Sequence, residues 1–227
     1  MSWNVVGYSS ATLRAGNKGA GACFIPVSGS KTIDLNDIKV VGYVDGCEGD
    51  VYVQQLDRYG RAQEAFTWYD LPEDEICGWF DGSDEPVEVG AVTLAIGDAL
   101  WVNAPDADYG IQSAGQVPTS DVATALRAGN KLVSNPTPVD VDLVNVVVSG
   151  YEDGCEGDVY VQQLDRYGRA QEAFTWYDLP EDDIYGWFNG SDEPVEEGAI
   201  VLAPGESLWV NAISTDYSIV FPGVAIK

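Results

Sequence analysis

The chain has no histidine and few basic residues. Among its 227 residues, 11 Lys and Arg stand against 37 Asp and Glu. Without histidine, the Ser-His-Asp and Cys-His nucleophile systems and every zinc or iron site with a histidine ligand are excluded. The net charge of −26 is repelled by phosphate backbones and by anionic lipid, which argues against nucleic-acid and membrane-surface binding. We therefore expect a protein that is not an enzyme.

Long apolar runs are missing as well. No stretch reaches the ~18 apolar residues of a membrane-spanning helix, so we expect no membrane insertion. The opening MSWNVVGYSS lacks the basic start and apolar run of a signal peptide. Either Met1 stands where a signal peptide was removed, or the protein is made without one. With 45% hydrophobic and 11% aromatic residues, the chain has the composition of a folded protein.

An internal repeat organises the chain. Residues 45–74 recur unchanged at 153–182, an offset of 108, and the motif LRAGNK begins at residue 13 and again at residue 126. Self-similarity over this length indicates a tandem duplication. The short polar linker QVPTSD places the boundary between a first module, 1–117, and a second module, 118–227. A recent duplication explains the identity; the alternative is that both copies present one surface to the same kind of partner.

Short strands and turns dominate each copy. Runs of β-branched and aromatic residues alternate with Gly, Pro and Asp, a pattern typical of strands. About eight or nine strands in ~110 residues predict an all-β protein of two tandem antiparallel β-sandwich modules, Ig-like or jelly-roll-like. In the first copy the predicted strands are 37–44, 50–57, 63–70, 76–82, 91–97 and 99–104, with others around 4–14, 21–27 and 109–117.

The clearest turn is the sequence Asp57-Arg58-Tyr59-Gly60, which recurs from Asp165 to Gly168. Asp suits the first turn position, and Gly60 supplies a positive φ. In the strand that follows, alternation places Phe66 and Trp68 on one face. We predict that both side chains lie in the core.

Several segments resemble β-modules of bacterial secreted and cell-surface proteins. The residues that carry this resemblance are the NVVGY start, LRAGNKLVSNPTPV at 126–139, the GWF strand, LAPGESLWV at 202–210 and the closing IVFPGV at 219–224. The resemblance implies an extracellular or cell-surface β-sandwich with a structural role. The first copy departs from this pattern, because GAGACFIPV replaces the NLVSNP element, and a rearrangement of its first strands is therefore expected.

Acidic loops offer oxygen ligands for calcium. Hard cations take six to eight oxygens, and carboxylates close together in Gly-containing loops can supply them. Repulsion moderated by water and salt explains the same residues without a metal. The cofactor prediction is therefore none or Ca²⁺. The candidate calcium ligands are Asp45, Glu48, Asp50, Asp84 and Glu85 in the first copy, and Asp153, Glu156, Asp158, Asp192 and Glu193 in the second, with Asp81 or Asn189 beside them.

Aromatic residues and cysteines leave further alternatives open. Exposed Trp and Tyr beside carboxylates would favour a carbohydrate-binding or adhesion module, but the apolar strand context of each tryptophan favours burial. The cysteines have two interpretations. An oxidising compartment would permit a Cys47–Cys77 disulfide, with Cys23 and Cys155 left to bridge modules or subunits. Otherwise all four are reduced, buried thiols.

Basic residues stop at the hairpin in each copy. Residues 62–126 and 170–226 contain no Lys or Arg, so the hairpin tips are basic and the later loops purely acidic. Such a surface favours head-to-tail contacts between copies of the chain, which build rings or filaments. The candidate interface residues are Arg58, Tyr59, Arg61, Arg166, Tyr167 and Arg169.

These patterns together predict a non-enzymatic structural protein. We expect it to lie outside the bacterial cell or on its surface and to assemble with itself into a filament, fibre or layer. A glycan-binding module is the first alternative. A virion decoration or fibre protein is the second, favoured if no signal peptide preceded Met1.

Overall fold

The computed structural model describes residues 6–21, 32–105, 109–165 and 167–225. Within these ranges the chain is all-β, as the sequence predicts, and its strands form small antiparallel sheets. The helices in this part of the chain are three-residue 3₁₀ turns, and no helix there is long and apolar enough to cross a membrane. These turns are η1 (Leu35–Asp37), η2 (Pro72–Asp74) and η3 (Leu143–Asn145).

The first copy forms three sheets. Their strand orders are β2-β9-β5-β6-β7, β1-β10-β4 and β3-β8. The strands are β1 (Val6–Thr12), β2 (Gly16–Gly21), β3 (Thr32–Asp34), β4 (Lys39–Val41), β5 (Cys47–Leu56), β6 (Ala62–Leu71), β7 (Ile76–Phe80), β8 (Thr93–Ala95), β9 (Ala99–Ala104) and β10 (Gly110–Gln116).

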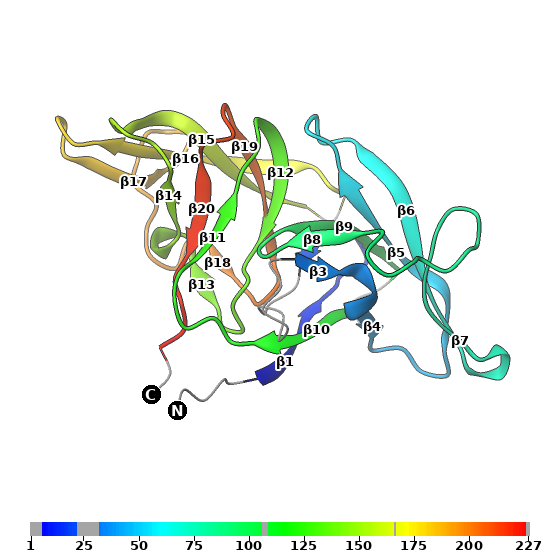
Figure 1. The fold of residues 1–227 in the computed structure, drawn as a ribbon. Coiled ribbons are helices and arrows are strands. Elements are labelled where there is room, and N and C mark those ends of the chain that lie inside the picture. Colours follow the sequence, from blue (N-terminus) through cyan, green and yellow to red (C-terminus); the bar gives the residue numbers. More distant parts are fainter. Residues whose placement is uncertain (1–5, 22–31, 106–108, 166, 226–227) are drawn as a thin grey trace.

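The second copy repeats this arrangement. Its sheets have the orders β12-β19-β15-β16-β17, β11-β20-β14 and β13-β18, so every sheet is built from strands of one copy. Figure 1 shows these strands mostly on the left and those of the first copy mostly on the right, and β12 contacts both β2 and β9. The strands are β11 (Val122–Ala125), β12 (Gly129–Ser134), β13 (Val141–Asp142), β14 (Val147–Ser149), β15 (Cys155–Leu164), β16 (Ala170–Leu179), β17 (Ile184–Phe188), β18 (Val201–Leu202), β19 (Ser207–Ala212) and β20 (Ser218–Phe221).

The predicted hairpin joins β5 to β6. Gly60 N donates to Asp57 O at 2.9 Å, and Gly60 has a φ of +78°, as the turn requires. Side chains alternate along β6, so Phe66 and Trp68 are buried while their neighbours are not. The prediction that both residues lie in the core is confirmed.

Each copy has its own hydrophobic core, built around a pair of tryptophans. Trp68 and Trp79 meet edge to face with ring centroids 5.1 Å apart, and Trp79 Nε1 donates to the carbonyl of Ile38 at 2.7 Å. Trp176 and Trp187 repeat this contact at 5.2 Å. All four are buried, because a hydrogen-bonded indole can be removed from water at little cost.

The opening of the first copy differs from its expected form. The strand predicted around 4–14 is confirmed by β1, whereas no pattern indicated β2 or β3. All but the first residue of the strand predicted around 21–27 falls within residues 22–31. Residues 22–31 lie outside the described residues. The expected rearrangement is absent from β2, because Gly16 faces Ala104 just as Gly129 faces Ala212 in the second copy.

Tyr43 connects a core tryptophan to a carboxylate. Its hydroxyl donates to Asp70 Oδ2 at 2.6 Å and accepts from Trp68 Nε1 at 3.3 Å. Burial first, and then the bond to Asp70, raise the pKa of Tyr43 to about 12. Tyr151 occupies the same place in the second copy, and mainly burial raises its pKa as well.

We expect stability to fall between about pH 10 and pH 12. Tyr43 donates only while protonated, so its contribution is complete below the unfolded pKa of 10.0 and is lost as the pH rises through the folded value of about 12. Urea unfolding across this range measures the loss. Tyr43→Phe cannot ionise and should show a shallower decline; an unchanged decline would contradict the assignment.

Candidate functional site

The two copies contact each other along a surface that we call the seam, formed mainly by β2, β9, β12 and β19. Gly21 N donates to Gly205 O at 2.9 Å, and Ser134 N donates to Gly97 O at 2.7 Å. Gly21 and Ser134 are equivalent in the two copies, as are Gly205 and Gly97. Each copy therefore gives the other the same bond, which is the property of a two-fold interface.

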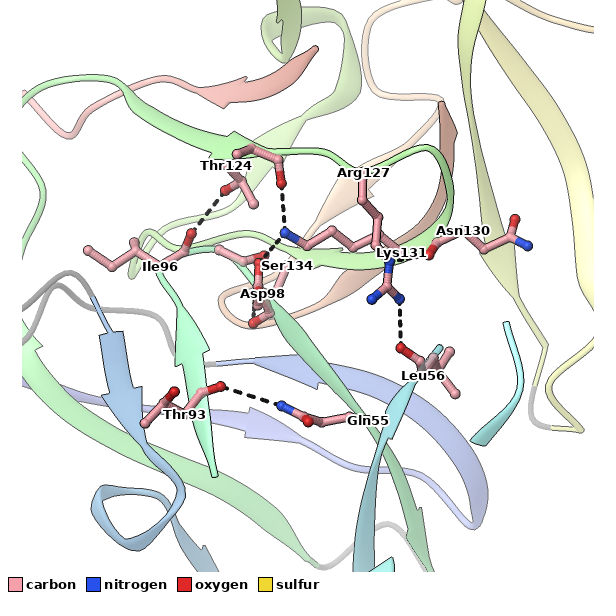
Figure 2. Close-up of polar contacts among 12 residues, drawn as sticks. Gln55, Leu56, Thr93, Ile96, Asp98, Thr124, Arg127, Asn130, Lys131 and Ser134 are labelled. Carbon is pink, nitrogen blue, oxygen red and sulfur yellow. Dashed lines mark hydrogen bonds and ion pairs between the residues drawn. The ribbon is translucent and has the colours of Figure 1, made fainter. Parts of the chain in front are cut away.

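The arginines of the duplicated LRAGNK motif cross the seam. Arg127 Nη2 donates to the carbonyl of Leu56 at 2.6 Å, while its Nε donates to Asn130 O in its own copy at 2.9 Å (Figure 2). Arg14 makes the equivalent bond to Leu164 O at 2.5 Å. Both acceptors end the first strand of a hairpin, so each arginine fixes the base of the hairpin of the other copy.

The lysines of the same motif form ion pairs across the seam. Lys131 Nζ lies 2.6 Å from Asp98 Oδ1 and donates to the carbonyl of Ala125 (Figure 2). Lys18 Nζ lies 3.8 Å from Glu206 Oε1. Burial lowers the pKa of Lys18, and Glu206 partly offsets this. Because these pairs are largely shielded from water, they are screened less than pairs on the open surface.

Hairpin tips dock on tryptophans across the seam. A Cβ atom added to Gly60 would lie 2.3 Å from the ring of Trp209, and one added to Gly168 would lie 2.5 Å from Trp101. Trp209 is further fixed by its Nε1, which donates to Asn130 Oδ1 at 3.0 Å. These two tryptophans are half-buried beneath the tips rather than within either core.

The side chains of the first tip remain exposed although its backbone is docked. The guanidinium groups of Arg58 and Arg61 lie 4.7 and 4.8 Å from the centre of the Tyr59 ring. Arg61 also pairs with Asp57 at 3.1 Å, and hydrogen bonds from the tip backbone, first that of Arg61, lower the pKa of Asp57.

The second tip shows the same division. Tyr167 and Arg169 are exposed, and the guanidinium of Arg169 lies 5.4 Å from the Tyr167 ring. Arg166 lies outside the described residues. Contact of the exposed tip side chains with a neighbouring molecule stays a prediction.

The seam is asymmetric where β2 meets β12. The second copy has Leu132 and Ser134 where the first has Gly19 and Gly21. A Cβ atom at Gly19 would lie 1.8 Å from Ser207 Oγ and 3.3 Å from Leu132 Cδ2. Glycine in the first copy therefore makes room for the larger side chains of the second, which accounts for Gly19 and Gly21 within the segment that departs from the LVSNP pattern.

The predicted calcium ligands are dispersed over loops and over the first residues of β5 and β15. Within the described ranges, no group of three or more Asp, Glu, Cys or His residues is arranged to hold a metal ion. Asp81 Oδ1 accepts from Ser83 N and Glu85 N, and Asn189 Oδ1 makes the same turn, so this loop closes on its own backbone. Calcium binding stays a prediction. Asp158 is half-buried, and the exposed candidates are Asp45, Glu48, Asp50, Asp84, Glu85, Asp153, Glu156, Asp192 and Glu193.

Three cysteines are free thiols: Cys47 and Cys155 are buried and Cys77 is exposed. Cys47 faces Asp70 on β6, and Asp70 faces Cys77 on β7, so a whole strand separates the two cysteines. Twice the ~4.8 Å strand spacing gives roughly 10 Å, beyond the ~7 Å that a disulfide spans. A Cys47–Cys77 disulfide therefore does not fit this fold. Cys23 lies outside the described residues, and its pairing with Cys155 stays a prediction.

Two cavities occupy equivalent positions in the seam. The larger, of about 460 Å³, is lined by Arg127 and Lys131 of the second copy and by Gln55 and Asp98 of the first. The smaller, of about 110 Å³, has Arg14, Lys18, Gln163 and Glu206 in the corresponding places.

The sequence pattern identified LRAGNK only as part of the repeat. Its Arg and Lys are present in both copies, and this retention is the signal that could have indicated a role for them.

Comparisons with protein-family models, with curated proteins and with solved structures returned no match. The resemblance to bacterial surface modules therefore stays a prediction. The main features of the structure are its all-β duplicated units and the reciprocal seam that joins them.

We expect Gly60→Ala to weaken the seam. The substitution strains a backbone at φ +78° and drives a methyl group into Trp209, so it should cost about 2 to 4 kcal/mol of unfolding free energy. Gly90→Ala is the matched control, because Gly90 has a φ of +86° and nothing within 4 Å of an added Cβ. Urea unfolding should show the smaller loss for Gly90→Ala; equal losses would mean that the tip does not press on Trp209.

Charge exchange tests the ion pairs. Lys131→Asp places two carboxylates together and should cost about 1 to 3 kcal/mol, whereas Lys131→Asp combined with Asp98→Lys should recover most of it. The same exchange at Lys18 and Glu206, which lie farther apart, should show weaker coupling. Additive losses at Lys131 and Asp98 in a double-mutant cycle would refute the pair.

Proposed function

We propose that the chain is a non-enzymatic structural protein of the bacterial surface or exterior, in which two β-sandwich modules form one unit that assembles with other copies. The sandwich proposal is supported by the grouping of sheets. In each copy a five-stranded sheet accompanies a three-stranded and a two-stranded sheet, and one hydrophobic cluster draws on all of them. Facing sheets that share a core are the basis of a sandwich.

The observation that carries the proposal is the reciprocity of the seam. Arg14 and Arg127 make the same bond in opposite directions across the seam, which is the pattern of an approximate two-fold axis. The outward faces of the two copies are related by the same axis. Residues 45–74 and 153–182 are identical, so the unit presents the same outward side chains twice. Two matching faces on one unit can bind two neighbours, and such contacts propagate into chains or layers.

The exposed tip side chains are the proposed contacts between units. Arg58 and Arg61 lie on a molecule whose net charge is −26, so the surface of a neighbour offers mostly carboxylates. Arg pairs with a carboxylate through two parallel hydrogen bonds. Each exposed pair contributes only ~0.2 to 1 kcal/mol, so these pairs would set orientation and apolar contacts would supply most of the affinity.

Reversal of the tip charges tests assembly. Arg58→Glu, Arg61→Glu and Arg169→Glu together should abolish higher-order species in sedimentation and negative-stain microscopy at low salt. The tips contact the seam through their backbone, so the fold should remain intact. Lys39→Glu, a single charge reversal away from the tips, is the control and should still assemble. A wild-type chain that stays monomeric under these conditions would refute assembly.

A further inference from the structure

The larger seam cavity has the size of a small-molecule site. Its volume of about 460 Å³ falls within the ~300 to 1,000 Å³ typical of ligand pockets. The equivalent cavity, at about 110 Å³, falls below that range. The smaller cavity has Glu206 and Ser207 where the larger has Asp98 and Ala99, and Gly19 where the larger has Leu132.

Arg127 lines this cavity without a carboxylate partner. Its guanidinium donates to the carbonyl oxygens of Leu56 and Asn130, both uncharged (Figure 2). It forms no ion pair with any described residue. The side chain is half-buried in a chain that has 37 acidic residues. Nη1 has no hydrogen-bond partner in the described part of the chain and can donate to a ligand.

The carboxylates of the cavity are already neutralised. Asp98 pairs with Lys131 at 2.6 Å, and Asp57 pairs with Arg61 at 3.1 Å while accepting from the backbone of the tip. Arg58 also lines the cavity, and its guanidinium lies over Tyr59 rather than beside a carboxylate. The cavity thus keeps positive charge in a strongly acidic protein.

Polar and apolar groups surround this charge. Gln55 Nε2 donates to Thr93 O at 3.4 Å (Figure 2). Its Oε1 accepts no hydrogen bond from the described residues. The side chains of Leu94 and Leu132 supply an apolar wall. An amide oxygen beside an apolar wall suits a ligand with hydroxyl groups on a carbon ring.

We propose that the larger seam cavity binds a hydroxylated monocarboxylate of the sugar-acid class. The ligand carboxylate accepts from Arg127 through the planar fork that guanidinium offers, and a ligand hydroxyl donates to Gln55 Oε1. A monoanion matches the cavity better than phosphate, because phosphate near neutral pH carries between one and two negative charges and meets stronger repulsion from the surrounding protein. Arg58 is shared with the proposed contacts between units, but Arg127 and Gln55, which carry this proposal, are not among those contacts.

Titration calorimetry of the full chain with sodium D-glucuronate tests the site. We expect one site per chain, at least tenfold weaker binding in Arg127→Gln, and weaker binding in Gln55→Ala. Arg14→Gln and Gln163→Ala are matched controls, since they remove the same side chains from the smaller cavity, and both should bind as the wild type does. Melting temperatures show whether each variant is folded, and Gln55→Ala keeps the test valid if Arg127→Gln unfolds.

Two further probes separate the sources of affinity. Glucose, which lacks the carboxylate, and inorganic phosphate, which lacks the ring, should each bind at least tenfold more weakly than glucuronate. The proposal is overturned by absent glucuronate binding, by phosphate or glucose binding as tightly as glucuronate, or by equal losses in Arg127→Gln and Arg14→Gln.

Discussion

Two acidic modules must be held against each other, and the rest of the structure depends on how this is done. The first copy carries 6 basic and 18 acidic residues, a net charge of −12, and the second carries 5 and 19, a net of −14. The seam places Arg14, Lys18, Arg127 and Lys131 opposite two carboxylates and several carbonyl oxygens. Positive charge therefore gathers where the copies meet, and repulsion there is replaced by attraction.

Charge alone does not define the geometry of the seam. The tips bring Gly60 onto Trp209 and Gly168 onto Trp101, so the hairpin backbone lies directly against an aromatic ring. No residue larger than glycine would permit this close approach. Gly19 then accepts the bulk of Leu132. Two copies with identical hairpins thus meet through opening strands that differ, and the difference makes the two halves complementary.

The sequence predicted much of each copy because its signals are local. Alternation along β6 identified Phe66 and Trp68 as core residues, and the Asp57 to Gly60 turn has its predicted hydrogen bond and positive φ. The short strand β3 went unnoticed because three residues carry too little periodicity. The proposed Cys47–Cys77 disulfide failed because strand order places β6 between them, and spacing along the chain does not reveal strand order.

The candidate site lay beyond any local pattern. By itself, the amino-acid sequence determined the all-β class, the duplication, the acidity and the hairpin tips, since composition and short-range periodicity specify these. Only the tertiary structure decided that the tips dock on the other copy and that LRAGNK supplies the cations of the seam. Arg127 lies 71 residues from its partner Leu56, and such a contact arises from the packing of whole sheets.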